Sequence, residues 1–133
     1  MGNTRVFESD NIEVAHQLIP DFFRPIDTEL SHVFSRFRVL FMAGNLDILV
    51  PVSSVPKAVD NIEWRCQQEL RNADKEIGVW SVEDKEVIGH LTTACDVYVV
   101  IVRNAGSNLI YDQQEITFTL TEMFTNVSLP LEV

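Results

Sequence analysis

The feature that most constrains the fold is a nearly unbroken apolar run over residues 38–43, which Gly44-Asn45 ends. A run this short and this apolar fits a β-strand covered on both faces, as is usual in a parallel sheet. Residues 55–71 follow with apolar side chains at helical spacing, which predicts an amphipathic helix that crosses over to a neighbouring strand. The sequence therefore predicts an α/β fold.

Three further runs rich in β-forming residues follow that crossover, at residues 76–82, 86–93 and 97–103. The first two flank Glu83-Asp84-Lys85, a charged segment typical of a solvated turn. We predict a three-stranded antiparallel meander, whose last strand runs parallel to the 38–43 strand.

Helices are predicted at both ends of the chain. Apolar residues between positions 11 and 37 keep a helical spacing that Pro20 and Pro25 interrupt, which predicts a short helix or turn and then a helix from about Asp27. The final helix is expected to begin near Asp112, with Asp112 as its cap and Glu115 completing a capping box. Its predicted buried stripe is Ile116, Leu120, Met123, Phe124 and Val127. Residues 1–133 are thus predicted to form one domain, a mixed sheet with flanking helices.

The charge of the chain excludes two classes of partner. Ten Lys and Arg residues stand against twenty Asp and Glu residues, so the formal net charge is −10. Neither nucleic acid nor an anionic membrane is an expected partner, because binding phosphates requires clustered Lys and Arg and the sequence has no such cluster. No apolar run approaches the roughly 20 residues that span a bilayer. The opening residues contain no apolar signal-peptide segment, and the compartment is left unassigned.

The two cysteines, Cys66 and Cys95, have neither CxxC spacing nor companions for a metal site. No metal or other cofactor is predicted, and whether the two cysteines pair is left open. Asn126-Val127-Ser128 is a glycosylation acceptor, which has meaning only if the chain enters the secretory pathway.

Two loops are candidates for a functional site, because functional groups in open α/β sheets collect at the carboxyl ends of the strands. The first is Gly44-Asn45-Leu46-Asp47, where an acid follows the buried strand. The second is 104–108, where we expect Gly106 to allow a sharp departure from the sheet. An Asp just past a strand can equally be a turn or cap residue, and that alternative stays open.

Several sequence blocks in and around these loops are similar to one family. The blocks are Phe41-Met42-Ala43-Gly44-Asn45-Leu46-Asp47-Ile48-Leu49-Val50, Ile62-Glu63-Trp64, Val102-Arg103-Asn104-Ala105-Gly106 and Tyr111-Asp112-Gln113. In this order and at these separations they resemble the carboxyl-terminal part of animal serine carboxypeptidases, with the nearest likeness to the vitellogenic-like branch. The resemblance extends over nearly the whole chain. It implies the carboxyl-terminal part of an α/β-hydrolase sheet, from a family that removes carboxy-terminal amino acids from peptides.

The resemblance places Asp47 at the position of the catalytic acid, which would orient an imidazole and stabilise the imidazolium. The family's catalytic His follows an Ala-Gly pair in the second loop, and here that position is Ser107. The family's nucleophile motif G-x-S-x-G does not occur in this sequence. We expect the chain to be inactive alone, as a pseudoenzyme would be. His16, His32 and His90 lie elsewhere and are expected to be ordinary polar or half-buried residues.

The family's sheet continues beyond the 38–43 strand, so this strand is expected to present an unpaired edge that invites another chain. The partner could be a separate heavy chain, with this chain as a cleaved light chain, or a second copy in a homo-oligomer. A peptide substrate is expected only if another polypeptide completes the site. The alternatives of a non-catalytic interaction protein and of a truncated copy both stay open.

Overall fold

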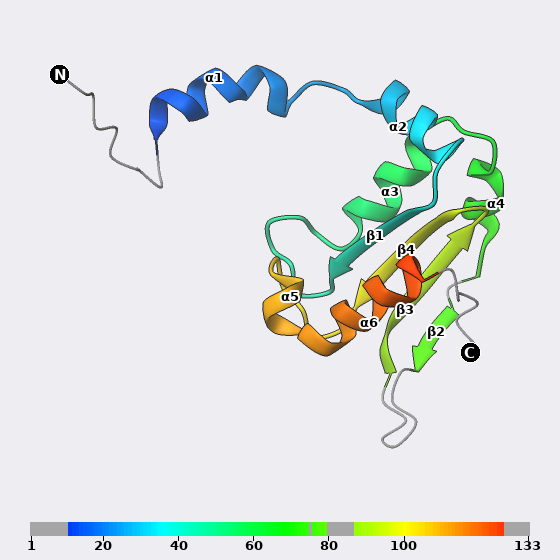
Figure 1. Ribbon diagram of the computed structural model, residues 1–133. Coiled ribbons are helices and arrows are strands. Elements are labelled where there is room, and N and C mark those ends of the chain that lie inside the picture. The colour runs from blue at the N-terminus through cyan, green and yellow to red at the C-terminus, as the bar shows by residue number, and fades with distance from the viewer. Residues whose placement is uncertain (1–10, 75, 80–86, 127–133) are drawn as a thin grey trace.

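A computed structural model describes residues 11–74, 76–79 and 87–126 of the chain (Figure 1). Its central feature is a four-stranded sheet in the order β1-β4-β3-β2. The strands are β1 (Val39–Gly44), β2 (Glu76–Val79), β3 (Val87–Ala94) and β4 (Val97–Val102). β1 runs parallel to β4, whereas β2, β3 and β4 pair antiparallel in succession. The predicted mixed sheet and meander are therefore confirmed.

Helices cover both faces of this sheet. The described helices are α1 (Ile12–Phe22), which stands apart from the sheet, and α2 (Asp27–Phe34), α3 (Ser54–Asn61), α4 (Gln67–Asn72), α5 (Leu109–Asp112) and α6 (Gln114–Thr125). Val97 and Val99 of β4 pack against α2, α3 and α4, while Val100 and Val102 pack with Leu120 of α6 on the opposite face. This alternation along one strand is what a sheet buried on both faces requires.

β1 lies at the edge of the described sheet, with β4 as its neighbour. The Val39 N–H donates to Asp96 O at 2.8 Å, and the Asn45 N–H donates to Val102 O at 2.9 Å. Along a strand, the N–H groups of successive residues point to opposite sides. Because the N–H groups of Val39 and Asn45 point towards β4, those of Leu40 and Met42 point away from it. Residues Val39 to Met42 are half-buried, because the open edge leaves them partly uncovered. The strand is nevertheless covered on both faces, as predicted, because Val39 and Phe41 pack against one core cluster while Leu40 and Met42 pack against the other.

The predicted crossover helix over residues 55–71 is two helices, α3 and α4. Ile62 ends α3 in an extended conformation with ψ 129°, although it is buried and continues the apolar spacing. Two contacts fix the break: Ser31 Oγ donates to Glu63 O, and the Trp64 ring packs edge-on against Phe34 at 5.5 Å. Trp64 is therefore packed against the core.

The final helix, α6, begins at Gln114, close to the predicted start, but the predicted cap was wrong. α5 begins first, and its cap is Asn108, whose side chain accepts from the Tyr111 N–H. Asp112 is the last residue of α5, and no side-chain cap bond opens α6 at Gln113. The buried positions of α6 are Thr117 and Leu120, while Ile116, Met123 and Phe124 are half-buried. Trp80, the charged turn at 83–85 and Val127 lie outside the described residues.

The end of α6 is tied to the start of β1 by one arginine. Arg38 Nη1 donates to Phe124 O at 3.0 Å, and its guanidinium lies 4.9 Å from the Phe124 ring centre and 5.7 Å from that of Tyr98. The two rings meet edge-to-face at 6.2 Å. A cation between two aromatic rings is a favourable contact.

α1 stands apart from the sheet in Figure 1 and has no buried residue. It continues through Pro20, which the sequence predicted as an interruption, and ends ahead of Pro25. Its exposed apolar residues are Ile12, Val14, Leu18, Ile19 and Phe22. Among the described residues no helix has the length and apolar character to cross a membrane.

Candidate functional site

The two predicted loops leave the sheet side by side, one after β1 and one after β4. The Leu46 N–H donates to Ala105 O at 2.9 Å, which joins the loops directly. Gly44 is required at this crossing, because a Cβ at position 44 would overlap the backbone oxygen of Ala105. The parallel pairing of β1 and β4 thus brings both loops to one edge of the sheet.

The structure brings the two predicted site residues into contact. Ser107 Oγ donates a hydrogen bond to Asp47 Oδ1 at 2.8 Å. The same oxygen accepts the N–H groups of Leu49 at 2.8 Å and Val50 at 3.0 Å. The Val50 N–H, the Ser107 hydroxyl and the Leu49 N–H stabilise the ionised carboxylate and lower the pKa of Asp47. Asp47 is therefore a turn-forming residue and also the neighbour of position 107.

The sharp departure of the second loop is at Asn104 and not at Gly106. Asn104 has φ 58°, and no described glycine has a positive φ. Asparagine tolerates this left-handed conformation better than most residues do. The Asn104 N–H donates to Asn45 Oδ1 at 2.8 Å, so the first loop holds the strained residue in place.

Asp112 and Asn45 are site residues that the sequence analysis missed. Asp112 Oδ2 accepts the Gly106 N–H at 2.7 Å and holds the backbone next to Ser107. Asn45, in the first loop, accepts the Asn104 N–H through its side-chain oxygen and so holds the backbone at the start of the second loop. Their side-chain bonds cross between segments that are separate in the sequence, so spacing alone gave no signal for them. The asparagine of Asn104-Ala105-Gly106 was the available clue, because it is a residue type suited to positive φ.

The three histidines lie on other elements. His16 belongs to the exposed helix α1, and His32 is exposed on α2. His90 is exposed on β3, opposite Ile101, and lines an open groove of about 560 Å³ between that strand and helices α3 and α4. The side-chain and backbone groups bonded to Asp47 come from Leu49, Val50 and Ser107.

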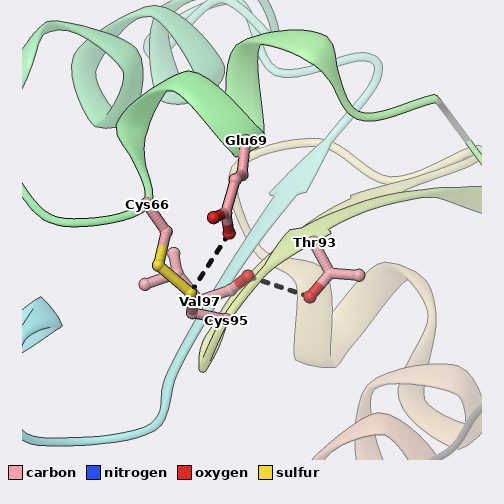
Figure 2. The surroundings of a disulfide bond; sticks show 5 residues. All are labelled: Cys66, Glu69, Thr93, Cys95 and Val97. Atoms are coloured by element: carbon pink, nitrogen blue, oxygen red, sulfur yellow. Dashed lines mark hydrogen bonds between the residues drawn. A yellow bond between two sulfur atoms is a disulfide. The ribbon is translucent and has the colours of Figure 1, made fainter.

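The two cysteines form a disulfide, which settles the pairing that the sequence left open (Figure 2). Cys66 caps α4 and is buried, whereas Cys95 is exposed in the turn between β3 and β4 with φ 49°. Glu69 Oε2 lies 3.4 Å from Cys95 Sγ. These three residues are a group of metal-type donors, but each sulfur is bonded to the other in this structure.

A mixed sheet with helices on both faces, and an acid in the loop after a strand that runs parallel to its neighbour, is typical of an α/β-hydrolase. A solved structure supports this fold: Kex1(delta)p, a prohormone-processing carboxypeptidase from Saccharomyces cerevisiae, matches 90% of this chain with a TM-score of 0.72 at 17% sequence identity. The profile of the serine carboxypeptidase family matches residues 2–127. The chain belongs to the serine carboxypeptidase family.

Curated relatives agree with that membership. The probable serine carboxypeptidase CPVL of Homo sapiens is 30% identical over 118 residues, which is 87% of this chain and 24% of the human protein. The vitellogenic carboxypeptidase of Aedes aegypti is 31% identical over 130 residues, 95% of this chain and 26% of its own. The venom serine carboxypeptidase of Apis mellifera is 26% identical over 126 residues. The chain thus spans about a quarter of the length of these relatives.

Proposed function

We propose that this chain is a serine carboxypeptidase-like segment that retains the acid of the catalytic site but does not hydrolyse peptides. The observation that supports this is the 2.8 Å hydrogen bond from Ser107 Oγ to Asp47 Oδ1. In a Ser-His-Asp site the acid accepts the N–H of an imidazole, which shuttles a proton between the nucleophile and the leaving group. Here a hydroxyl is the side-chain group bonded to the acid.

Neither member of this pair is suited to act as a general base near neutral pH. A serine hydroxyl has no proton-accepting capacity comparable to an imidazole. Asp47 has a lowered pKa, since three donors stabilise its charge. In a comparable triad, loss of the base alone lowers turnover by on the order of a millionfold.

The test is hydrolysis of a blocked dipeptide by the purified protein, followed by release of the carboxy-terminal amino acid. We expect no release above the buffer control, and the same result for Asp47→Ala and for Ser107→His, because the sequence contains no G-x-S-x-G nucleophile motif. Asp47→Ala removes the acid and is therefore the matched control. Hydrolysis by the unaltered protein that Asp47→Ala abolishes would refute the proposal.

A second proposed function is that of a light chain, which pairs with a separate and heavier polypeptide through the free edge of β1. The position of β1 at the edge of the described sheet supports it, because the outward N–H groups of Leu40 and Met42 can each bond to an added strand. The exposed apolar side chains of α1 form a second surface on which a partner chain could pack.

Native mass spectrometry of the protein isolated from its source tests this role. We expect a heavier chain at a fixed ratio, and either a lone monomer or a homo-oligomer would contradict the light-chain hypothesis. Met42→Pro removes one outward N–H, while Met42→Ala serves as its control by removing the side chain only. The proline variant alone is expected to weaken the complex, since the N–H at position 42 does not bond to β4.

A further inference from the structure

Three metal-type donor atoms meet beside α4: the sulfurs of Cys66 and Cys95 and a carboxylate oxygen of Glu69 (Figure 2). These atoms all lie within 4.8 Å of one another. Cys66 and Glu69 are one helical turn apart, and the turn between β3 and β4 brings Cys95 to them. Because the donors come from two elements that pack together only in the fold, the spacing of the cysteines gave no signal for this group.

The Glu69 side chain points from α4 towards the disulfide (Figure 2). Its Oε2 atom lies 3.4 Å from Cys95 Sγ. The ion pairs within the part of the chain that the structure describes use Arg24 and Arg71, and none of them includes Glu69. The carboxylate next to the two sulfurs therefore has no basic partner among the described residues.

The distances suit a tetrahedral cation. Zn²⁺ binds thiolate sulfur at about 2.3 Å and carboxylate oxygen at about 2.1 Å, so neighbouring ligand atoms are about 3.6–3.8 Å apart. The contact of Glu69 Oε2 with Cys95 Sγ is already close to this separation. The Cα atoms of Cys66 and Cys95 are 6.3 Å apart, so side-chain rotation can bring the two sulfurs to the same separation once the disulfide is open.

Burial differs among the three donors in a way that suits binding from solvent. Cys66 is buried, whereas Cys95 and Glu69 are exposed. The buried sulfur would fix the ion against the fold, and the exposed side leaves room for a water molecule as the fourth ligand. Soft thiolate ligands select Zn²⁺ over Mg²⁺ and Ca²⁺, which prefer oxygen.

We propose that Cys66, Glu69 and Cys95 form a binding site for a thiophilic divalent cation, Zn²⁺, when the disulfide is reduced. A thiol reductant gives two electrons to the sulfur–sulfur bond and becomes a disulfide itself, while its two protons pass to the cysteines. Binding of Zn²⁺ releases these protons to solvent and forms two Zn–S bonds and one Zn–O bond. The disulfide and the metal are thus alternative cross-links between α4 and the β3–β4 turn. This inference does not depend on whether the chain hydrolyses peptides.

Titration of the purified chain with Co²⁺ tests the site, because Co²⁺ substitutes for Zn²⁺ and absorbs visible light strongly in a tetrahedral site. The chain is reduced with a phosphine, the phosphine is removed without air, and Co²⁺ is added alone. We expect one Co²⁺ per chain, with thiolate-to-cobalt charge-transfer bands that Zn²⁺ bleaches, and no such bands from the oxidised chain. A reduced chain without these bands, or one Co²⁺ shared between two chains, would overturn the proposal.

Two variants with the same change of charge test the third ligand. Glu69→Gln should weaken the binding of Co²⁺ about tenfold, because a neutral amide replaces the charged carboxylate. Glu63→Gln removes a charge from an exposed residue outside the donor group and should leave the affinity unchanged. Equal affinities of the two variants would contradict the role of Glu69.

Urea unfolding provides a second readout that does not depend on absorbance. Zn²⁺ should raise the unfolding midpoint of the reduced chain, followed by Trp64 fluorescence, and should leave that of the oxidised chain unchanged. If the reduced chain unfolds without metal, Zn²⁺ should restore its fold, because the metal replaces the lost cross-link. A reduced chain that does not respond, or an equal response of both forms, would also overturn the proposal.

Discussion

Removal of the Cys66–Cys95 cross-link is expected to lower the free energy of unfolding substantially. Closing a loop of 29 residues removes about 12 cal/mol/K of entropy from the unfolded chain, or about 3.6 kcal/mol at 25 °C in the chain-entropy description. Natural domains have a free energy of unfolding of roughly 5–15 kcal/mol. The cross-link therefore contributes a large share of the stability of this chain.

The perturbation best suited to this test is Cys95→Ala. Cys95 is exposed, so loss of its sulfur opens no cavity, whereas truncation of the buried Cys66 would add a packing defect to the measurement. Urea unfolding can be followed by tryptophan fluorescence, because Trp64 packs against Phe34 in the core and is released on unfolding. We expect the denaturant slope to rise, since an unfolded chain without the cross-link exposes more surface.

A reducing agent provides the internal control. It should destabilise the unaltered protein by about the same amount as Cys95→Ala does, and it should leave that variant unchanged. A loss below about 1 kcal/mol in both comparisons, or an equal effect of the reductant on the variant, would refute the chain-entropy argument.

Three other changes test the candidate site and the disulfide. Gly44→Ala is expected to lower the free energy of unfolding by about 1–3 kcal/mol, because its Cβ meets the backbone of the second loop. Gly106→Ala should lower it less, because a Cβ there meets only a side-chain oxygen at 3.2 Å. Equal losses in chemical unfolding would contradict the close approach of the two loops. Ser107→Ala should raise the pKa of Asp47 towards its ordinary value in an NMR titration, and an unchanged pKa would argue against the hydroxyl contact. In the unaltered protein, the stability that this carboxylate adds above its unfolded pKa should disappear as pH falls through its folded pKa. Glu69→Gln should speed reduction of the disulfide by a small thiolate about fivefold at low salt. The reason is that a carboxylate near the exposed sulfur repels the anionic thiolate by about 1 kcal/mol. A rate equal to that of the unaltered protein would rule out this repulsion.

The sequence pattern predicted those parts of the fold that depend on local periodicity. The apolar run before Gly44 and the three β-rich runs after residue 75 became one sheet with the expected directions. The break between α3 and α4 could not be predicted, because Ile62 and Cys66 continue the apolar helical spacing through it. What ends α3 is long-range, including the bond of Ser31 to Glu63.

The candidate site, too, could be predicted from the sequence only in part. That Asp47 and position 107 share one edge of the sheet follows from parallel strands, and the resemblance to the family singled out both positions. The roles of Asp112 and Asn45 depend on three-dimensional contacts between loops, and Asp112 was instead predicted to cap the last helix. A short polar residue beside a helix start has several possible backbone partners, and periodicity does not choose among them.

The stacking of Arg38 between Tyr98 and Phe124 has a consequence for how the chain responds to ionic strength. Its guanidinium is held by two aromatic rings and a carbonyl oxygen, none of which has a formal charge that salt could screen. The exposed pairs of Arg24 are of the opposite type and weaken in concentrated salt. Because the chain has a net charge of −10, added salt relieves its self-repulsion while the last helix stays fastened to the edge strand. High salt is therefore expected to weaken the ion pairs of Arg24 more than the contact of Arg38 with the end of α6.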